Sequence, residues 1–332
     1  FAVWAAVAHV GWADDPDAWL RAQWPTIERG AALLARWRDP ATGLHAPAQE
    51  DDAAAYTQTL HGAITVFGAL DLAARAARRL GNDAQADAWF ARARELKAAM
   101  EASFRDPAQG DVFVMGESER LPLQASGQTA VGPTAWLVWP TPLYALDHPA
   151  VAAQLARDLA LIEPALDLTA VGGLYYMKNT IALAVAGRGR LGPAVDQRVD
   201  DLPALLAAQA TDTDHFGEVM VVDPAGAPQQ RVSTPHLWEG ALYYLTVAAV
   251  EDPGQLLRYE QALPPSEAQG QAPDAGPPVA PDAGPPAADA GPDSAPAPDG
   301  CACRAGQTPP GSGLWLLALG ADAVERLDPT SG

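Results

Sequence analysis

Residues Ala53 to Phe104 read AAAYTQTLHGAITVFGALDLAARAARRLGNDAQADAWFARARELKAAMEASF. The composition predicts a long helix over residues 53–80, a stop at Gly81-Asn82 and a second helix over residues 83–104. Helices joined by so short a loop pack as antiparallel neighbours. The stretch therefore predicts a helical hairpin, and this unit decides how the rest of the chain is interpreted.

The same unit is predicted to recur along residues 1–263. Residues 17–37 carry apolar side chains close to the helical period, and the turn Asp39-Pro-Ala-Thr-Gly43 ends that pattern. Further helices are predicted over residues 1–10, 134–146, 149–162, 174–187, 193–209, 236–250 and 255–263. Short strands are predicted only in connections, at residues 112–115 and 219–222. About five hairpins result, and an all-α toroid of hairpins fits better than an α/β sheet, which needs repeated β-rich runs.

Charge and length exclude several classes of protein. The 332 residues carry a formal net charge of −20, and a nucleic-acid duplex repels such a surface. The sequence contains no apolar run of the roughly 20 residues that a membrane-spanning helix needs. The charge is uneven, since residues 1–263 carry −13, residues 264–300 carry −6 and residues 301–332 carry −1. The sequence therefore predicts an acidic folded domain over residues 1–263.

Residues 264–300 are predicted to form a disordered spacer rich in Pro, Ala, Asp and Gly, with a repeat seen in Pro273-Asp-Ala-Gly-Pro-Pro278. Residues 301–332 follow, with Cys301, Cys303 and the apolar stretch Gly313–Gly320. This tail resembles the C-terminal sorting signal of myxobacterial surface proteins, although its apolar run is about half a membrane span and it lacks the arginine cluster. The resemblance implies a secreted or surface-attached protein. Because the chain starts at Phe1 in what reads as mid-helix, we expect a fragment whose export signal is missing.

Motifs in the order and spacing of one enzyme family lie within the predicted hairpin domain. They are Trp37-Arg-Asp-Pro-Ala-Thr-Gly-Leu44, Pro133-Thr-Ala-Trp-Leu-Val-Trp-Pro140, Gly217-Glu-Val-Met-Val-Val-Asp-Pro-Ala-Gly226 and Ser233-Thr-Pro-His-Leu-Trp-Glu-Gly-Ala-Leu-Tyr-Tyr244. Together they resemble glycoside hydrolase family 15, the glucoamylase-type enzymes among the six-hairpin glycosidases. The resemblance implies an (α/α)6 toroid, here N-terminally incomplete, that hydrolyses an α-glucosidic bond with inversion.

The implied mechanism needs two carboxyl groups about 6.5–9.5 Å apart, one donating a proton and one activating water. The resemblance assigns the general base to Glu218, which precedes an Asp-Pro-x-Gly turn. The family carries the general acid in a Gly-Leu-Trp-Glu motif, where this chain has Ala46 at the acid position. A loop longer by four residues makes Glu50 the expected acid, with Asp51 or Asp52 as alternatives. These acids could instead complement the dipole of the following helix.

Sugar recognition needs flat apolar faces and hydrogen-bonding groups, and several side chains in the family-like segments could supply them. The candidate substrate-binding residues are Trp37, His45, Asp51, Asp52, Tyr56, Gln58, His61, Trp136, Trp139, His215, His236 and Trp238. Each aromatic ring or imidazole could equally be part of the core. Glu239 is interpreted as a helix N-terminal acid.

Other chemistries find little support in the sequence. It contains no phosphate-binding loop after a strand and no Gly-x-Ser-x-Gly elbow, and the spacing of His215 and His236 matches no standard metal site. We therefore expect no cofactor and no metal, a carbohydrate as the partner and a monomeric chain. The alternatives are another six-hairpin glycosidase with a different glycan specificity, or a non-catalytic glycan-binding or surface scaffold domain, which Ala46 favours.

Overall fold

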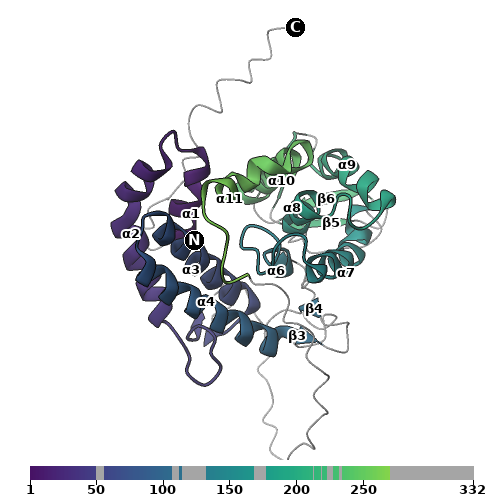
Figure 1. Cartoon of the computed structure of the whole chain (residues 1–332). Helices are drawn as coiled ribbons and strands as arrows, with labels where there is room; N and C mark the ends of the chain where they lie inside the picture. Colours follow the sequence, from purple (N-terminus) through teal and green to yellow (C-terminus); the bar gives the residue numbers. More distant parts are fainter. Residues whose placement is uncertain are drawn as a thin grey trace, which may run out of the picture. The chain divides into compact units, whose positions relative to one another are not determined.

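A computed structural model of the chain describes residues 1–49, 56–106, 112–113, 132–167, 177–211, 213–217, 219–222, 227–231 and 234–269. These residues belong to one compact unit, and most of them are helical (Figure 1). The prediction of an all-α fold is confirmed. Residues 270–300 of the predicted spacer and the tail at residues 301–332 lie outside the described residues.

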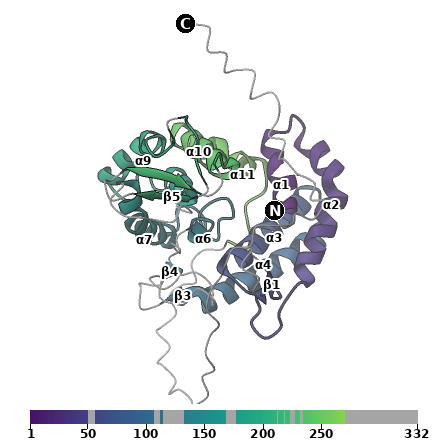
Figure 2. The ribbon, with the colours of Figure 1, turned by 180° about the vertical axis from the view of Figure 1, so that it is seen from behind.

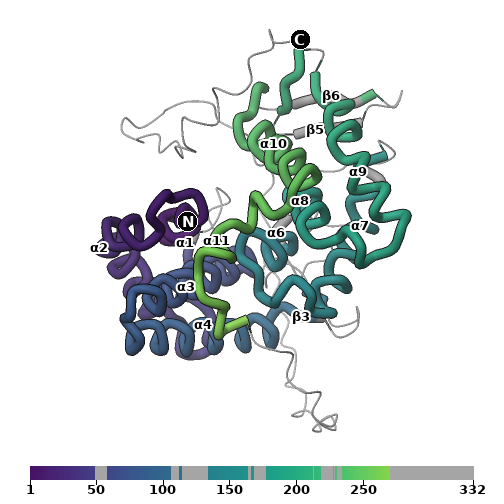
Figure 3. Tube along the Cα trace, turned by 45° about the horizontal axis from the view of Figure 1, so that its top comes forward, coloured from purple at the N-terminus to yellow at the C-terminus, as the bar shows by residue number. Residues whose placement is uncertain are grey.

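The first half of the unit consists of α1 (Ala2–Ala8), the 3₁₀ turn η1 (His9–Trp12), α2 (Pro16–Arg36), α3 (Leu60–Arg79) and α4 (Asp83–Phe104). At the start of α2, the Asp15 carboxylate accepts the backbone N–H groups of Asp17 and Ala18 at 3.1 and 3.0 Å. The predicted hairpin is present, with α3 and α4 side by side in Figure 3. Gly81 turns the chain between them at φ 79°, a conformation that favours glycine.

The predicted start of the first hairpin helix at residue 53 is wrong. Tyr56–Thr57 form strand β2, which pairs antiparallel with β1 (Ala48–Gln49), and α3 begins only at Leu60. The Thr59 hydroxyl accepts the N–H of Gly62 at 3.0 Å, so a side-chain cap sets the helix start. α3 is buried on almost every side from Leu60 to Ala77 and forms the centre of this half.

The second half contains α6 (Gly132–Ala135), α7 (Pro149–Leu166), α8 (Met177–Ala186), α9 (Pro193–Ala207) and α10 (Leu237–Glu251). The 3₁₀ turn η4 (Pro253–Leu257) and α11 (Arg258–Ala262) then follow. α8 packs against α6, α7 and α10, and α10 also packs against α9. Figure 2 shows this group from behind, beside the group formed by α1 to α4.

One sequence prediction for this half is wrong, and one strand was not predicted. The helix predicted over residues 134–146 ends at Ala135, because Pro140 and Pro142 lack the N–H that a continuing helix needs. Strand β5 (Val219–Val222) was predicted, but its antiparallel partner β6 (Pro228–Arg231) was not. A further short pair joins β3 (Arg105–Asp106) to β4 (Val112–Phe113).

The end of the described chain returns to its beginning. α11 packs against η1, and a side-chain carbon placed on Gly11 would lie 2.5 Å from the backbone nitrogen of Tyr259. Residues 264–269, which the sequence assigned to the spacer, also pack on the helices. Lys97 Nζ donates to the Gln269 carbonyl at 2.8 Å, and Gln269 Nε2 donates to the Pro142 carbonyl at 2.9 Å. The folded unit therefore extends past residue 263.

Among the described residues, none of the helices combines the length and the apolar character that crossing a bilayer requires.

Candidate functional site

The four predicted catalytic candidates, Glu50, Asp51, Asp52 and Glu218, lie outside the described residues, and their roles stay predictions. The chain on either side of them is described. Gln49 and Tyr56 are register partners in the β1–β2 pair, and Gly217 and Val219 border Glu218. The side chain of Tyr56 also lies outside the description.

Three of the predicted substrate-binding residues are linked to one another and to one lysine by ring and cation–π contacts. The ring of Trp136 is 4.6 Å from that of His61, edge to face at 74°. The Lys178 ammonium lies 5.5 Å from the ring centroid of Trp136 and 5.4 Å from that of Trp238. Both distances are within the range of cation–π attraction. We call His61, Trp136, Lys178 and Trp238 the aromatic–ammonium cluster.

The cluster lies at the N-terminal ends of three helices. His61, Lys178 and Trp238 are the second residues of α3, α8 and α10, and Trp136 directly follows α6. A helix N-terminus carries unpaired backbone N–H groups and a partial positive charge. Trp136 is buried at 4% exposure whereas Trp238 is 46% exposed, so the cluster has one aromatic ring in the interior and one open to solvent.

A buried carboxyl group borders the cluster. Glu239, the third residue of α10, is 1% exposed, and its Oε2 atom contacts His236 Nδ1. Burial raises the pKa of Glu239, while the contact with His236 and the charge of Lys178 act in the opposite direction. The carboxyl group thereby orients the imidazole of the residue that precedes α10.

His236 also ties the segment 213–217 to the start of α10. Its backbone N–H donates to the Phe216 carbonyl at 2.7 Å. The predicted binding residue His215 is exposed, and its Nδ1 lies 3.1 Å from the Thr213 hydroxyl. The segment that leads to Glu218 is therefore fixed to the helix that carries Trp238.

The remaining described candidates contact other parts of the chain. Trp37 and His45 stack with ring centroids 5.1 Å apart, and His45 is fully buried. Gln58 Nε2 donates to the Asp39 carboxylate at 2.9 Å and to the His45 carbonyl at 2.7 Å. Trp139 Nε1 donates to the Leu256 carbonyl at 3.4 Å. These contacts hold loops in place, and a role of these residues in substrate binding stays a prediction.

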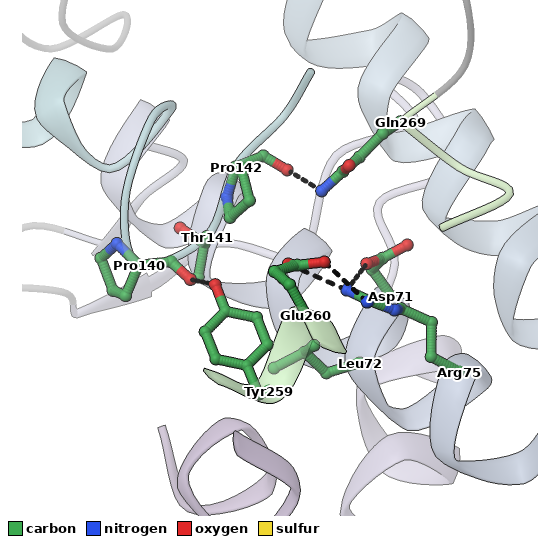
Figure 4. Close-up of a pocket in the computed structure, with 10 residues that line it drawn as sticks. Asp71, Leu72, Arg75, Pro140, Thr141, Pro142, Tyr259, Glu260 and Gln269 are labelled. Atoms are coloured by element: carbon green, nitrogen blue, oxygen red, sulfur yellow. Dashed lines mark hydrogen bonds and ion pairs between the residues drawn. The ribbon is translucent and has the colours of Figure 1, made fainter. Parts of the chain in front are cut away.

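A small cavity elsewhere in the unit is lined by an ion-pair network, which we call the Arg75 network (Figure 4). The Arg75 guanidinium makes two hydrogen bonds to the Glu260 carboxylate, at 3.0 and 2.7 Å, and its Nε donates to the Pro264 carbonyl at 2.6 Å. Asp71 lies 3.9 Å from Arg75 and contacts the Ser266 hydroxyl. The cavity volume of about 10 Å³ is the space of about one water molecule, too little for a sugar.

Sequence reasoning missed Lys178 as a member of the cluster and interpreted Glu239 mainly as a helix N-terminal acid, with contact to the substrate as the alternative. One signal was available, because Lys178 is one of just two lysines in the whole chain. Periodicity could not have identified it, since a lysine in the first turn of a helix is ordinarily solvent-exposed.

Comparison of the chain with models of known protein families, with curated proteins and with solved structures gives no match.

Proposed function

We propose that the chain is a glycoside hydrolase that cleaves α-glucosidic linkages with inversion, on an (α/α)6 toroid of the glucoamylase type. One observation carries the proposal. The aromatic–ammonium cluster joins the start of α3 to the start of α10, and the chain runs into those two helices from the segments that contain Glu50 and Glu218. Aromatic rings at the starts of two helices that follow carboxylate-bearing segments in the sequence suit the binding of a pyranose.

Substrate binding and catalysis fall to different residues in this proposal. Trp238, half exposed, offers a face for a sugar ring, and the buried Trp136 holds the ring of His61 by an edge-to-face contact. A base must be ionised, and a carboxylate that enters the cluster would meet the Lys178 ammonium, which favours the charged form. In this proposal Glu218 activates the water and Glu50 donates the proton to the leaving oxygen.

Hydrolysis of maltose, trehalose and longer α-glucans by the full chain tests the function. We expect the β-anomer as the first product by proton NMR and a loss of about 10²- to 10⁴-fold in kcat for Glu218→Gln. Glu251→Gln makes the same chemical change at an exposed position of α10 and serves as the matched control. Equal rates for the Glu218→Gln variant and the wild type would refute the assignment of the base.

The identity of the acid needs a second substrate. An α-glucosyl fluoride carries a leaving group that needs little protonation, so loss of the acid should slow maltose far more than the fluoride. We expect this selective loss for Glu50→Gln and not for Asp51→Asn or Asp52→Asn. The same loss in one of the two aspartate variants would move the acid to that residue.

A non-catalytic glycan-binding domain is the second candidate, and Ala46 at the position of the family's acid favours it. Calorimetric titration with malto-oligosaccharides separates the two. Binding by the wild type with no turnover of any α-glucan would support the binding domain, and turnover that Glu218→Gln abolishes would exclude it.

A further inference from the structure

A buried aspartate links the two segments that carry Trp136 and Lys178. Asp158 lies in α7 with 1% of its surface exposed. Its Oδ2 atom accepts a hydrogen bond from the Thr134 hydroxyl at 2.7 Å and another from Asn179 Nδ2 at 3.1 Å. Thr134 precedes Trp136 by two residues, and Asn179 directly follows Lys178. One carboxylate oxygen therefore holds α6 and α8 at a fixed spacing.

The second oxygen of Asp158 fixes this arrangement to α7 and β4. Asp158 Oδ1 accepts from Gln154 Nε2 at 3.0 Å and from Arg157 Nη1 at 3.3 Å. Gln154 Oε1 in turn accepts the backbone N–H of Phe113 at 2.9 Å. All four groups around the Asp158 carboxylate are donors, so both of its oxygens act as acceptors.

We propose that Asp158 is a positioning residue that sets the distance between Trp136 and Lys178 and thereby the affinity of the aromatic–ammonium cluster for its glycan. The identification of the ligand as a glycan rests on the proposed function, whereas the effect of Asp158 on the geometry of the cluster does not. A displacement of about 1 Å within a site can cost about 10²-fold in rate, so the spacing of these two side chains matters.

The ionised form of Asp158 accepts all four of these hydrogen bonds. Protonation places a hydrogen on one of its two oxygens, so at least one of the four neighbouring groups must turn or, like the Thr134 hydroxyl, accept instead of donating. Among the described residues, the charged group that faces the carboxyl is Arg157, while Thr134, Gln154 and Asn179 are neutral. Burial raises the pKa of Asp158 to about 6, so mild acid reaches the protonated form.

Three variants test the proposal. Asp158→Asn places an NH₂ group where only acceptors fit, and Thr134→Val removes one donor at nearly constant volume. Thr134→Ser keeps the hydroxyl and is the matched control. For Asp158→Asn and Thr134→Val we expect KM for the α-glucan to rise by about tenfold or more with a smaller change in kcat, because uniform binding is lost. Thr134→Ser should behave as the wild type, and its failure to do so would overturn the proposal.

A spectroscopic measurement separates this proposal from the proposed function. In the full chain labelled with 5-fluorotryptophan, the ¹⁹F signal of Trp136 should move in Thr134→Val and should titrate between pH 5 and 7 in the wild type. The signals of Trp24 and Trp89, which pack on each other at 5.9 Å, should not. If the chain hydrolyses no glycan, the proposed function fails, and the ¹⁹F result still decides the positioning. A Trp136 signal that is unchanged in Thr134→Val and independent of pH would overturn it.

Discussion

Replacement of Arg75 by methionine should destabilise the protein more than any exposed arginine replacement on the same helix. The change keeps most of the hydrocarbon and removes a guanidinium that is 1% exposed. Glu260 and the Pro264 carbonyl lose their shared hydrogen-bond donor, and Asp71 loses the neighbouring positive charge while it keeps the Ser266 hydroxyl. The lost interactions connect α3 to the segment that follows η4, so the substitution should destabilise both together.

The magnitude follows from burial. Removal of one partner from a buried ion pair costs about 3–5 kcal/mol, because the remaining charge stays desolvated. The Glu260 side chain is 33% exposed and keeps part of its hydration, so the expected cost is about 3 kcal/mol. The cost should be smaller at pH 5 than at pH 8, since Asp71 without its cation can take up a proton.

Urea unfolding at pH 8 measures the loss as a shift in midpoint at constant slope. Arg78→Met is the control, because Arg78 also lies on α3 and pairs with three acids, but those partners are exposed. Amide hydrogen exchange should further show faster exchange over residues 258–269 in Arg75→Met and unchanged exchange in α9. A cost for Arg75→Met that does not exceed that for Arg78→Met would refute the reasoning.

Three further outcomes are expected. Gly68→Ala brings a methyl group to 2.3 Å from the Cγ2 atom of Thr141 and should lower the unfolding free energy by about 1–3 kcal/mol. Gly240→Ala has open space around it and should raise the unfolding free energy by up to about 1 kcal/mol in the same urea assay. Burial raises the pKa values of Asp71 and Asp158 to about 6, so the stability that their protonated forms contribute is complete below about pH 4 and is lost as the pH rises through 6. The urea midpoint should therefore be higher at pH 5 than at pH 8, and Asp71→Asn should reduce this difference. Trp238→Ala should weaken glycan binding by about tenfold or more in calorimetry while the thermal midpoint barely changes, because its ring is half exposed, and a large thermal shift would contradict that view.

The fold class could be predicted from the sequence because it depends on local patterns. Residues 83–104 form α4 as predicted, because the turn at Gly81 and the apolar spacing both depend only on residues close together in the sequence. The start of α3 could not be predicted. Residues 53–59 have helical composition, and it is the Thr59 cap and the pairing of Tyr56 with Gln49 that decide against the helix there.

The candidate site was predictable in part for the same reason. The family-like segments identified His61, Trp136 and Trp238, which are far apart in the sequence, but the two tryptophans are linked through a lysine that no motif contains. Asp158 could not be identified from the sequence because the two partners on which its proposed role depends lie in α6 and α8, 24 and 21 residues away in the sequence. Such long-range partners leave no pattern in the neighbouring residues.

The contact between Gly11 and Tyr259 has a consequence for synthesis of the protein. η1 leaves the ribosome about 250 residues before α11 does, and at roughly 5–20 residues per second this interval lasts about 10–50 s. During that time the surface of η1 that α11 later covers faces solvent on a nascent chain. A chaperone that shields apolar segments would act in this window, and a chain terminated before Arg258 should aggregate where the complete unit does not.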